Sequence, residues 1–200
     1  MASWDDRTVT NEHLLPYVDS NTASPDVKAA LQTLPFERNI FKLLANSNVF
    51  FKPFMTLLSS AWSEDRKIRS TDWQLIVLRT AATLDAPYEW DVNEPVARIF
   101  GFTDEPLPEG LFTARQRLLG RIVTTLGRES RVGAGTVAEA RAVFSDEEVA
   151  EILYVQGIYS FLARFMNSAR IDFDAPIPGL EEQLRKYNAK TIEKEKRYVD

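Results

Sequence analysis

The 200-residue sequence contains no cysteine and only one histidine. Without a thiol, the chain can form no disulfide and no cysteine-ligated metal site, and it has no sulfur nucleophile. We expect the one histidine, His13, to lie on the surface or to fill the core instead of acting in catalysis. Because histidines and carboxylates do not recur at the spacing of metal ligands, we expect no metal site.

Long apolar runs and an excess of positive charge are also missing. No segment approaches the ~20 apolar residues that span a bilayer, and the N-terminus lacks the basic and apolar regions of a signal peptide. The 24 lysines and arginines are scattered among 29 aspartates and glutamates, with a formal net charge of -5, which disfavours nucleic acid as a partner. We therefore expect a cytoplasmic protein that binds neither nucleic acid nor a membrane.

Helix signals recur along the chain, whereas strand signals hardly appear. Hydrophobic residues make up 44% of the sequence, which is enough to bury a globular core. Predicted helix starts are Ser24, Asn39, Asn48, Pro87 and Thr113, with capping boxes at Thr71 and Gln74, Thr136 and Glu139, and Ser145 and Glu148. The sequence predicts an all-α bundle of about six to eight helices in a single domain.

Three segments follow from the changes in composition. We divide the chain into an N-terminal arm with a short helix (1–38), a helical domain (39–172) and a charged C-terminal tail (173–200). The last dozen residues have mixed charge, so we expect them either to fray or to dock on a neighbouring subunit.

The segment from Ala86 to Gly101 gathers aromatic, acidic and amide side chains at the start of one short helix. Glu89 and Asn93 are four residues apart and share a helix face, and Tyr88 lies on the adjoining face. A carboxyl group beside an amide suits proton transfer, because the amide can donate a hydrogen bond to developing negative charge. The plainer alternative is a glutamate favoured by the helix dipole next to an ordinary surface asparagine.

Four blocks of sequence, in this order, resemble the carboxymuconolactone decarboxylase family, whose fold is shared with the AhpD-like alkyl hydroperoxidase proteins. The blocks are Asn39 to Ser47, Gln74 to Arg79, Tyr88 to Arg98 and Phe144 to Asn167. The resemblance implies an all-helical AhpD-like fold and assembly as a trimer or hexamer. It also implies either cofactor-free decarboxylase chemistry or thiol-dependent peroxidase chemistry.

The chain departs from the redox branch of that family at every functional position. The resemblance places the glutamate of that branch at Gln74, its two cysteines at Ala86 and Glu89, and its histidine at Asn93. Neither Ala86 nor Glu89 can form a sulfenic acid or a disulfide, which excludes a peroxidase. The non-redox branch keeps the Tyr-Glu-Trp sequence found here but often has a histidine where this chain has Asn93, which cannot titrate.

Candidate site residues follow from the motif and the resemblance together. The catalytic candidates are Glu89, Tyr88 and Asn93, and the candidates for substrate binding are Gln74, Arg79, Trp90, Tyr159, Arg164 and Asn167. Arg79 and Arg164 interrupt apolar helices, so each is expected to pair with an internal carboxylate or with an anionic substrate. Trp90 is alternatively a core or interface residue, and Gln74 a group that only satisfies buried backbone.

The sequence predicts a cofactor-independent, non-redox enzyme of decarboxylase, dehydratase or isomerase type, acting on a small oxygenated carbocyclic or lactone-like metabolite. The alternative is a catalytically degenerate relative that serves as a binding or assembly protein. Glu89 salt-bridged to Arg79 or Arg164 would favour that alternative. The number of aromatic residues, notably Phe50 and Phe51, predicts a homo-oligomer.

Overall fold

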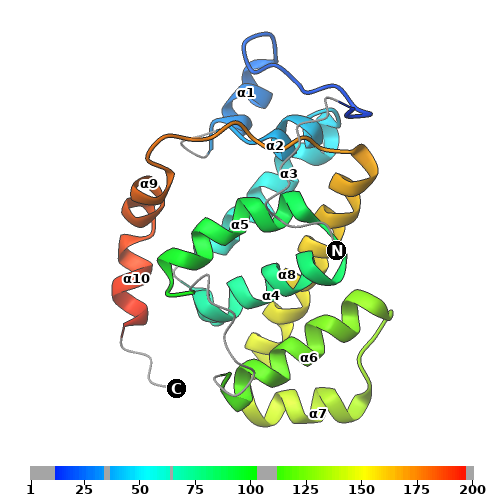
Figure 1. The fold of residues 1–200 in the computed structure, drawn as a ribbon, viewed down its shortest axis with the longest axis vertical. Coiled ribbons are helices and arrows are strands. Elements are labelled where there is room, and N and C mark those ends of the chain that lie inside the picture. The colour runs from blue at the N-terminus through cyan, green and yellow to red at the C-terminus, as the bar shows by residue number, and fades with distance from the viewer. Residues whose placement is uncertain (1–11, 34–36, 64, 103–111, 197–200) are drawn as a thin grey trace. The chain divides into compact units, whose positions relative to one another are not determined.

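The computed structural model describes residues 12–33, 37–63, 65–102 and 112–196, which form α-helices joined by turns and loops (Figure 1). Ten α-helices and one short 3-10 helix lie in these ranges, and none of the residues described there is in a strand. The all-α prediction is confirmed. The helices outnumber the six to eight predicted because short segments, including two in the charged tail, are also helical.

The chain divides into two compact units, which are Met1–Arg66 with Met166–Pro178 and Lys67–Phe165 with Gly179–Asp200. The first unit contains α1 (Pro25–Leu31), α2 (Asn39–Leu44), α3 (Asn48–Ser59) and the 3-10 helix Ser60–Trp62. The second contains α4 (Ser70–Thr83), α5 (Pro87–Ile99), α6 (Ala114–Arg128), α7 (Ala134–Val143), α9 (Leu180–Tyr187), α10 (Ala189–Glu195) and most of α8 (Asp146–Ala169).

Buried polar contacts organise the first unit. The Nδ1 atom of His13 lies 2.9 Å from the Asp172 carboxylate, so this histidine forms a structural pair and is not simple core filler. Asp174 accepts hydrogen bonds from Arg38 at 3.1 Å and from the backbone N–H of Asn39 at 2.8 Å. Asn39 is therefore the first residue of α2 and not its predicted cap.

Helix α3 leaves part of its apolar surface uncovered within the first unit. Val49, Phe50 and Leu57 are exposed, whereas Phe51 is buried. Exposed apolar side chains on one helix are typical of an interaction surface. Assembly as a trimer or hexamer stays a prediction.

In the second unit, α4 packs against both α5 and α6 (Figure 1). A tight turn joins α4 to α5, in which Asp85 adopts a left-handed conformation with φ 50° and the Ala86 N–H donates to the Ala81 carbonyl at 2.9 Å. Aspartate tolerates this conformation better than most residues. Ala81 and Ala86 form a small core with Ala163 of α8, which fixes the start of α5.

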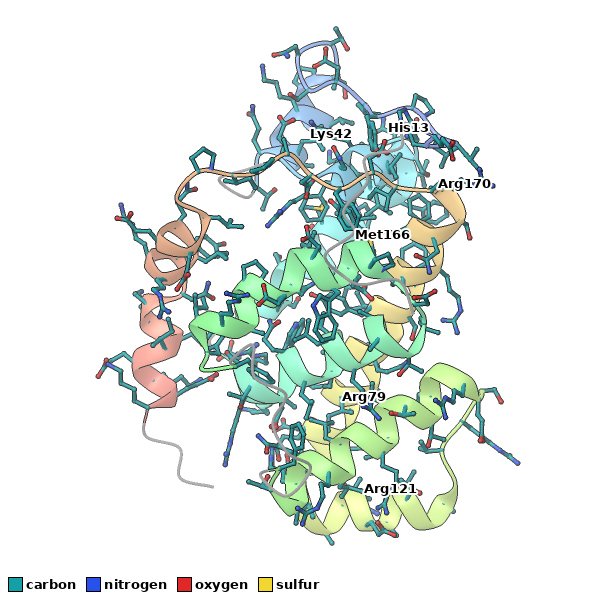
Figure 2. The ribbon with its side chains drawn as sticks, viewed as in Figure 1. His13, Lys42, Arg79, Arg121, Met166 and Arg170 are labelled. Carbon is teal, nitrogen blue, oxygen red and sulfur yellow. The ribbon has the colours of Figure 1, made fainter. Side chains whose placement is uncertain are left out.

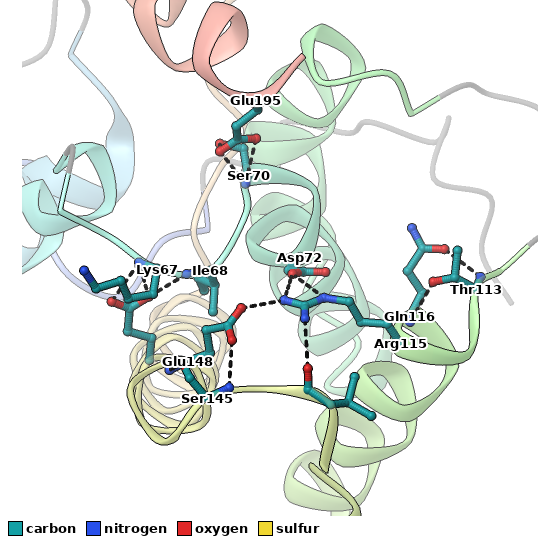
Figure 3. Close-up of polar contacts among 12 residues, drawn as sticks. Lys67, Ile68, Ser70, Asp72, Thr113, Arg115, Gln116, Ser145, Glu148 and Glu195 are labelled. Carbon is teal, nitrogen blue, oxygen red and sulfur yellow. Dashed lines mark hydrogen bonds and ion pairs between the residues drawn. The ribbon is translucent and has the colours of Figure 1, made fainter. Parts of the chain in front are cut away.

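The N-terminus of α4 differs from its predicted capping box. The helix begins at Ser70, so Thr71 lies inside it and cannot act as the cap. The backbone N–H and the hydroxyl of Ser70 each donate to the Glu195 carboxylate at 2.9 Å (Figure 3). This contact ties α10 to its own chain. Glu195, and not the predicted pair of Thr71 and Gln74, thus binds the N-terminus of α4.

The other predicted helix caps have mixed outcomes. Thr113 forms a complete box with Gln116 at the start of α6 (Figure 3). Ser145 and Glu148 form the one at the start of α8, with hydrogen bonds of 2.8 and 3.2 Å. The box at Thr136 is wrong, because α7 already begins after Gly133.

Arg115 joins three helices of the second unit (Figure 3). Its Nη2 atom lies 2.8 Å from both the Asp72 carboxylate of α4 and the Glu148 carboxylate of α8. The guanidinium also stacks 4.1 Å above the Phe144 ring. Each of the two carboxylates therefore has a positively charged partner, and both share the one guanidinium.

Two glycines of α6 allow a matched test of the contact between α4 and α6. A Cβ atom added at Gly127 would lie 2.6 Å from Thr83 Cγ2, whereas one at Gly120 would meet nothing within 4 Å. The Thr83 hydroxyl donates to the Arg79 carbonyl at 2.7 Å, which holds the rotamer in place. We expect Gly127→Ala to destabilise the protein by about 1–3 kcal/mol and Gly120→Ala to stabilise it by about 0.5–1 kcal/mol. Urea unfolding of both variants measures this difference. If Gly127→Ala is as stable as the wild type or more stable, the helices are not in close contact at Gly127.

Candidate functional site

Glu89 is the central residue of the candidate site. It lies in the first turn of α5, its side chain is 1% exposed, and within the described parts of the chain neither carboxyl oxygen has a hydrogen-bond partner. Loss of hydration on burial raises the pKa of the Glu89 carboxyl well above its ordinary value. The carboxyl group is therefore held in a place that favours its protonated form.

Asn93 lies one turn further along α5 and is also buried. Its side-chain amide donates to the backbone carbonyl of Glu89 at 2.8 Å. A side-chain amide has two N–H donors, so one remains beyond this bond. The plainer alternative is wrong about Asn93, which is buried and not on the surface. Glu89 does lie in the first turn of α5, as that alternative had it.

Gln74 of α4 is the second buried group with an unmatched oxygen. Its side chain is 4% exposed, and Oε1 has no hydrogen-bond partner among the residues described. Gln74 lies on α4, which packs against α5, the helix that carries Glu89 and Asn93. The two helices meet at the contact between Ala81 and Ala86.

Helix α8 contributes buried polar residues to the same unit. Gln156 donates from Nε2 to the Ser160 hydroxyl at 2.6 Å. Ser160 is not among the site residues predicted from the sequence, although its spacing of four residues from Gln156 on an apolar helix indicates such a contact. Thr80 of α4 is fully buried and its hydroxyl has no partner in the described ranges. Thr80 lies about 120° around α4 from Gln74 and therefore on a different face of the helix.

The aromatic candidates pack within the second unit. Tyr88 and Tyr159 are buried, and the Tyr159 ring meets the Trp73 ring edge to face at a centroid distance of 6.2 Å. Trp90 is half-buried against the core of Ala81, Ala86 and Ala163, in agreement with its alternative as a packing residue. These contacts are typical of aromatic packing.

The two arginine candidates are exposed, unlike the buried Glu89, Asn93 and Gln74. Arg79 is exposed on α4, and its Nε donates to the Thr124 hydroxyl of α6 at 2.8 Å (Figure 2). Arg164 is exposed on α8 and donates to the Ser160 carbonyl at 3.1 Å. The expectation that each pairs with an internal carboxylate is wrong, because both side chains reach solvent and bond to neutral oxygens. Asn167 is also exposed and belongs to the first unit.

Among the described residues, no group of three or more histidine, aspartate or glutamate side chains could hold a metal ion. In the same residues, every helix is too short or too polar to cross a bilayer.

Several solved structures share the fold of this chain. An uncharacterized peroxidase-related protein from Silicibacter sp. TM1040 matches with a TM-score of 0.67 at 14% identity, covering 89% of this chain and 100% of that one. The debrominase Bmp8, as a cysteine-to-alanine variant in complex with 2,3,4-tribromopyrrole, matches with a TM-score of 0.63 at 15% identity, covering 89% and 97%.

A protein of unknown function from Agrobacterium tumefaciens, proposed to be the antioxidant defence protein AhpD, matches with a TM-score of 0.58 at 20% identity. It covers 66% of this chain and 95% of that one. No family model and no curated protein matches the sequence. Identities this low establish the fold and leave the chemistry to the residues of the site.

Proposed function

Since the chain has the AhpD-like fold without its thiols, we propose that it is a cofactor-independent, non-redox enzyme in which Glu89 transfers protons. The observation that carries this proposal is the buried Glu89 carboxyl, whose oxygens have no partner among the described residues. A buried polar group without a hydrogen bond destabilises a fold by about 1–3 kcal/mol. Groups retained at such a cost, with a raised pKa, are characteristic of catalytic sites.

The proposed chemistry uses one residue in two protonation states. In a dehydration, the Glu89 carboxylate removes the proton from the carbon beside the substrate carbonyl, and the C–H electron pair moves into an enolate. The Glu89 O–H formed in this way then protonates the substrate hydroxyl, the enolate electrons form the C=C double bond, the C–O bond breaks and water leaves. An isomerisation uses the same two transfers, with the proton returned to a different carbon, whereas in a decarboxylation the C–CO2 bond breaks and Glu89 only donates a proton to the resulting carbanion. The remaining N–H of Asn93 can stabilise negative charge on a substrate oxygen.

A small oxygenated ring, carbocyclic or lactone-like, is the substrate class that we propose. Glu89, Asn93 and Gln74 offer a few polar groups among buried apolar side chains, which is typical of sites for small molecules. The debrominase that shares this fold binds the small ring 2,3,4-tribromopyrrole. This likeness is an analogy at the level of the fold.

The alternative of a degenerate binding protein predicted that Glu89 would be salt-bridged to Arg79 or Arg164. Those arginines instead contact Thr124 and the Ser160 carbonyl, and within the described chain no salt bridge includes Glu89. A carboxyl group kept only for structure would be paired. The unpaired Glu89 therefore supports the enzyme.

Proton transfer to a simple ring tests the proposal. In deuterated water at pH 7, the protein is expected to accelerate both deuterium exchange at the α-carbon of β-hydroxycyclohexanone and its dehydration, as followed by NMR. Because the chain has no thiol, the same preparation is expected to reduce no alkyl hydroperoxide. Rates equal to those of buffer for exchange and dehydration, or turnover of a hydroperoxide, would contradict the proposed function.

A further inference from the structure

The buried oxygens of the site differ in what they require from a ligand. The Gln74 Oε1 atom is an acceptor and needs an O–H or N–H donor. Protonated Glu89 offers one donor and one acceptor. Because the described chain supplies no partner for either group, a ligand bound between α4 and α5 has at least one acceptor to satisfy.

Positive charge is absent from the buried part of this unit. Among the described residues of the second unit, no lysine or arginine is buried. Helices α4, α5 and α8 carry one cationic residue each, and all three are exposed: Arg79, Arg98 and Arg164. Arg115 of α6 is already bound to two carboxylates. An anionic ligand would therefore lose its hydration without gaining a counter-charge.

We infer that the site takes an uncharged ring that carries at least one O–H or N–H donor, which binds Gln74 Oε1, and that it rejects a ring that carries a carboxylate. This inference rests on the proposed function, since it assumes that the ligand binds beside Glu89. It also narrows the reaction. Decarboxylation begins from a carboxylate, so dehydration or isomerisation of a neutral substrate remains.

Three unreactive rings of similar size test the inference by calorimetric titration at pH 7. They are cyclohexanol, which has a donor, cyclohexanone, which has only an acceptor, and cyclohexanecarboxylate, which is an anion. We expect cyclohexanol to bind about tenfold more tightly than cyclohexanone, because it satisfies Gln74. The carboxylate is expected to bind at least tenfold more weakly than cyclohexanol.

The variant Gln74→Leu removes the acceptor while nearly keeping the side-chain volume. It is expected to abolish the preference for cyclohexanol over cyclohexanone and to leave the melting temperature equal or higher, because an unmatched buried amide is lost. Gln32→Leu makes the same chemical change at an exposed position and is expected to leave the preference unchanged.

Three outcomes would overturn the inference. It fails if the carboxylate binds as tightly as cyclohexanol, if no ring binds at millimolar concentration, or if Gln74→Leu keeps the wild-type preference.

The proposed function is tested separately, by the proton exchange rate of Glu89→Gln. If the carboxylate is preferred but Glu89→Gln still loses exchange, the substrate class is wrong and the proton-transfer function stands. If cyclohexanol is preferred but Glu89→Gln exchanges normally, the proposed function is wrong.

Discussion

The variant Glu89→Gln is expected to lower the rates of deuterium exchange and dehydration of β-hydroxycyclohexanone by about 10²–10⁴-fold. Glutamine keeps the size and the hydrogen-bonding reach of the side chain but has no titratable proton. NMR rates measured beside the melting temperature separate lost chemistry from lost folding. The fold is expected to survive, because Glu89 has no ion pair to break within the described chain.

A matched control lies on the same helix. Glu94 is bound to the exposed Arg98 four residues further along α5, and Glu94→Gln is expected to leave both rates unchanged. If Glu89→Gln is well folded and exchanges at the wild-type rate, Glu89 has no role in the proton transfer. Tyr88 would then be the remaining titratable candidate in this part of α5.

The second large effect is a dependence of stability on pH. Burial raises the pKa of folded Glu89 well above its ordinary value of 4.5, whereas the unfolded chain keeps the ordinary value. Above pH 4.5 the folded state therefore binds more protons than the unfolded state at this position. The contribution of Glu89 to stability is complete below that pH and is lost as the pH rises through the folded pKa.

The loss is expected to approach about 1.4 kcal/mol per pH unit, the limit for a single proton. Glu89→Gln lacks this dependence, so the melting temperature of the variant minus that of the wild type should increase by about 4 °C per pH unit. Thermal unfolding followed by circular dichroism between pH 5 and pH 8 measures the difference. Parallel curves for the two proteins would mean that Glu89 titrates normally and is hydrated.

Local sequence patterns predicted the helices well, because capping and periodicity are properties of neighbouring residues. The cap at Thr113 and the box at Ser145 formed as predicted. The box at Thr71 did not form, because the distant Glu195 binds the start of α4. Such a contact between segments far apart in the sequence cannot be read from the spacing around Thr71.

The candidate site was predictable only in part. The spacing of four residues predicted Glu89 and Asn93 on one helix face, and the structure shows both side chains buried and the Asn93 amide bonded to the backbone carbonyl of Glu89. Their burial depends on how α4 and α8 pack, which the motif does not contain. Arg79 and Arg164 were misjudged because a single arginine on an apolar helix has two physical solutions. Its long side chain can pair inside the protein or reach solvent, and both residues do the latter.

Infrared difference spectroscopy of the wild type against Glu89→Gln tests the central claim most directly, because it observes the Glu89 proton itself. At pH 5.5, above the ordinary pKa of 4.5, the wild type is expected to show the C=O band of a protonated carboxylic acid that is missing from the variant, since burial raises the pKa of Glu89 well above that value. A difference spectrum that contains only carboxylate bands at this pH would contradict the claim that Glu89 is a buried proton donor.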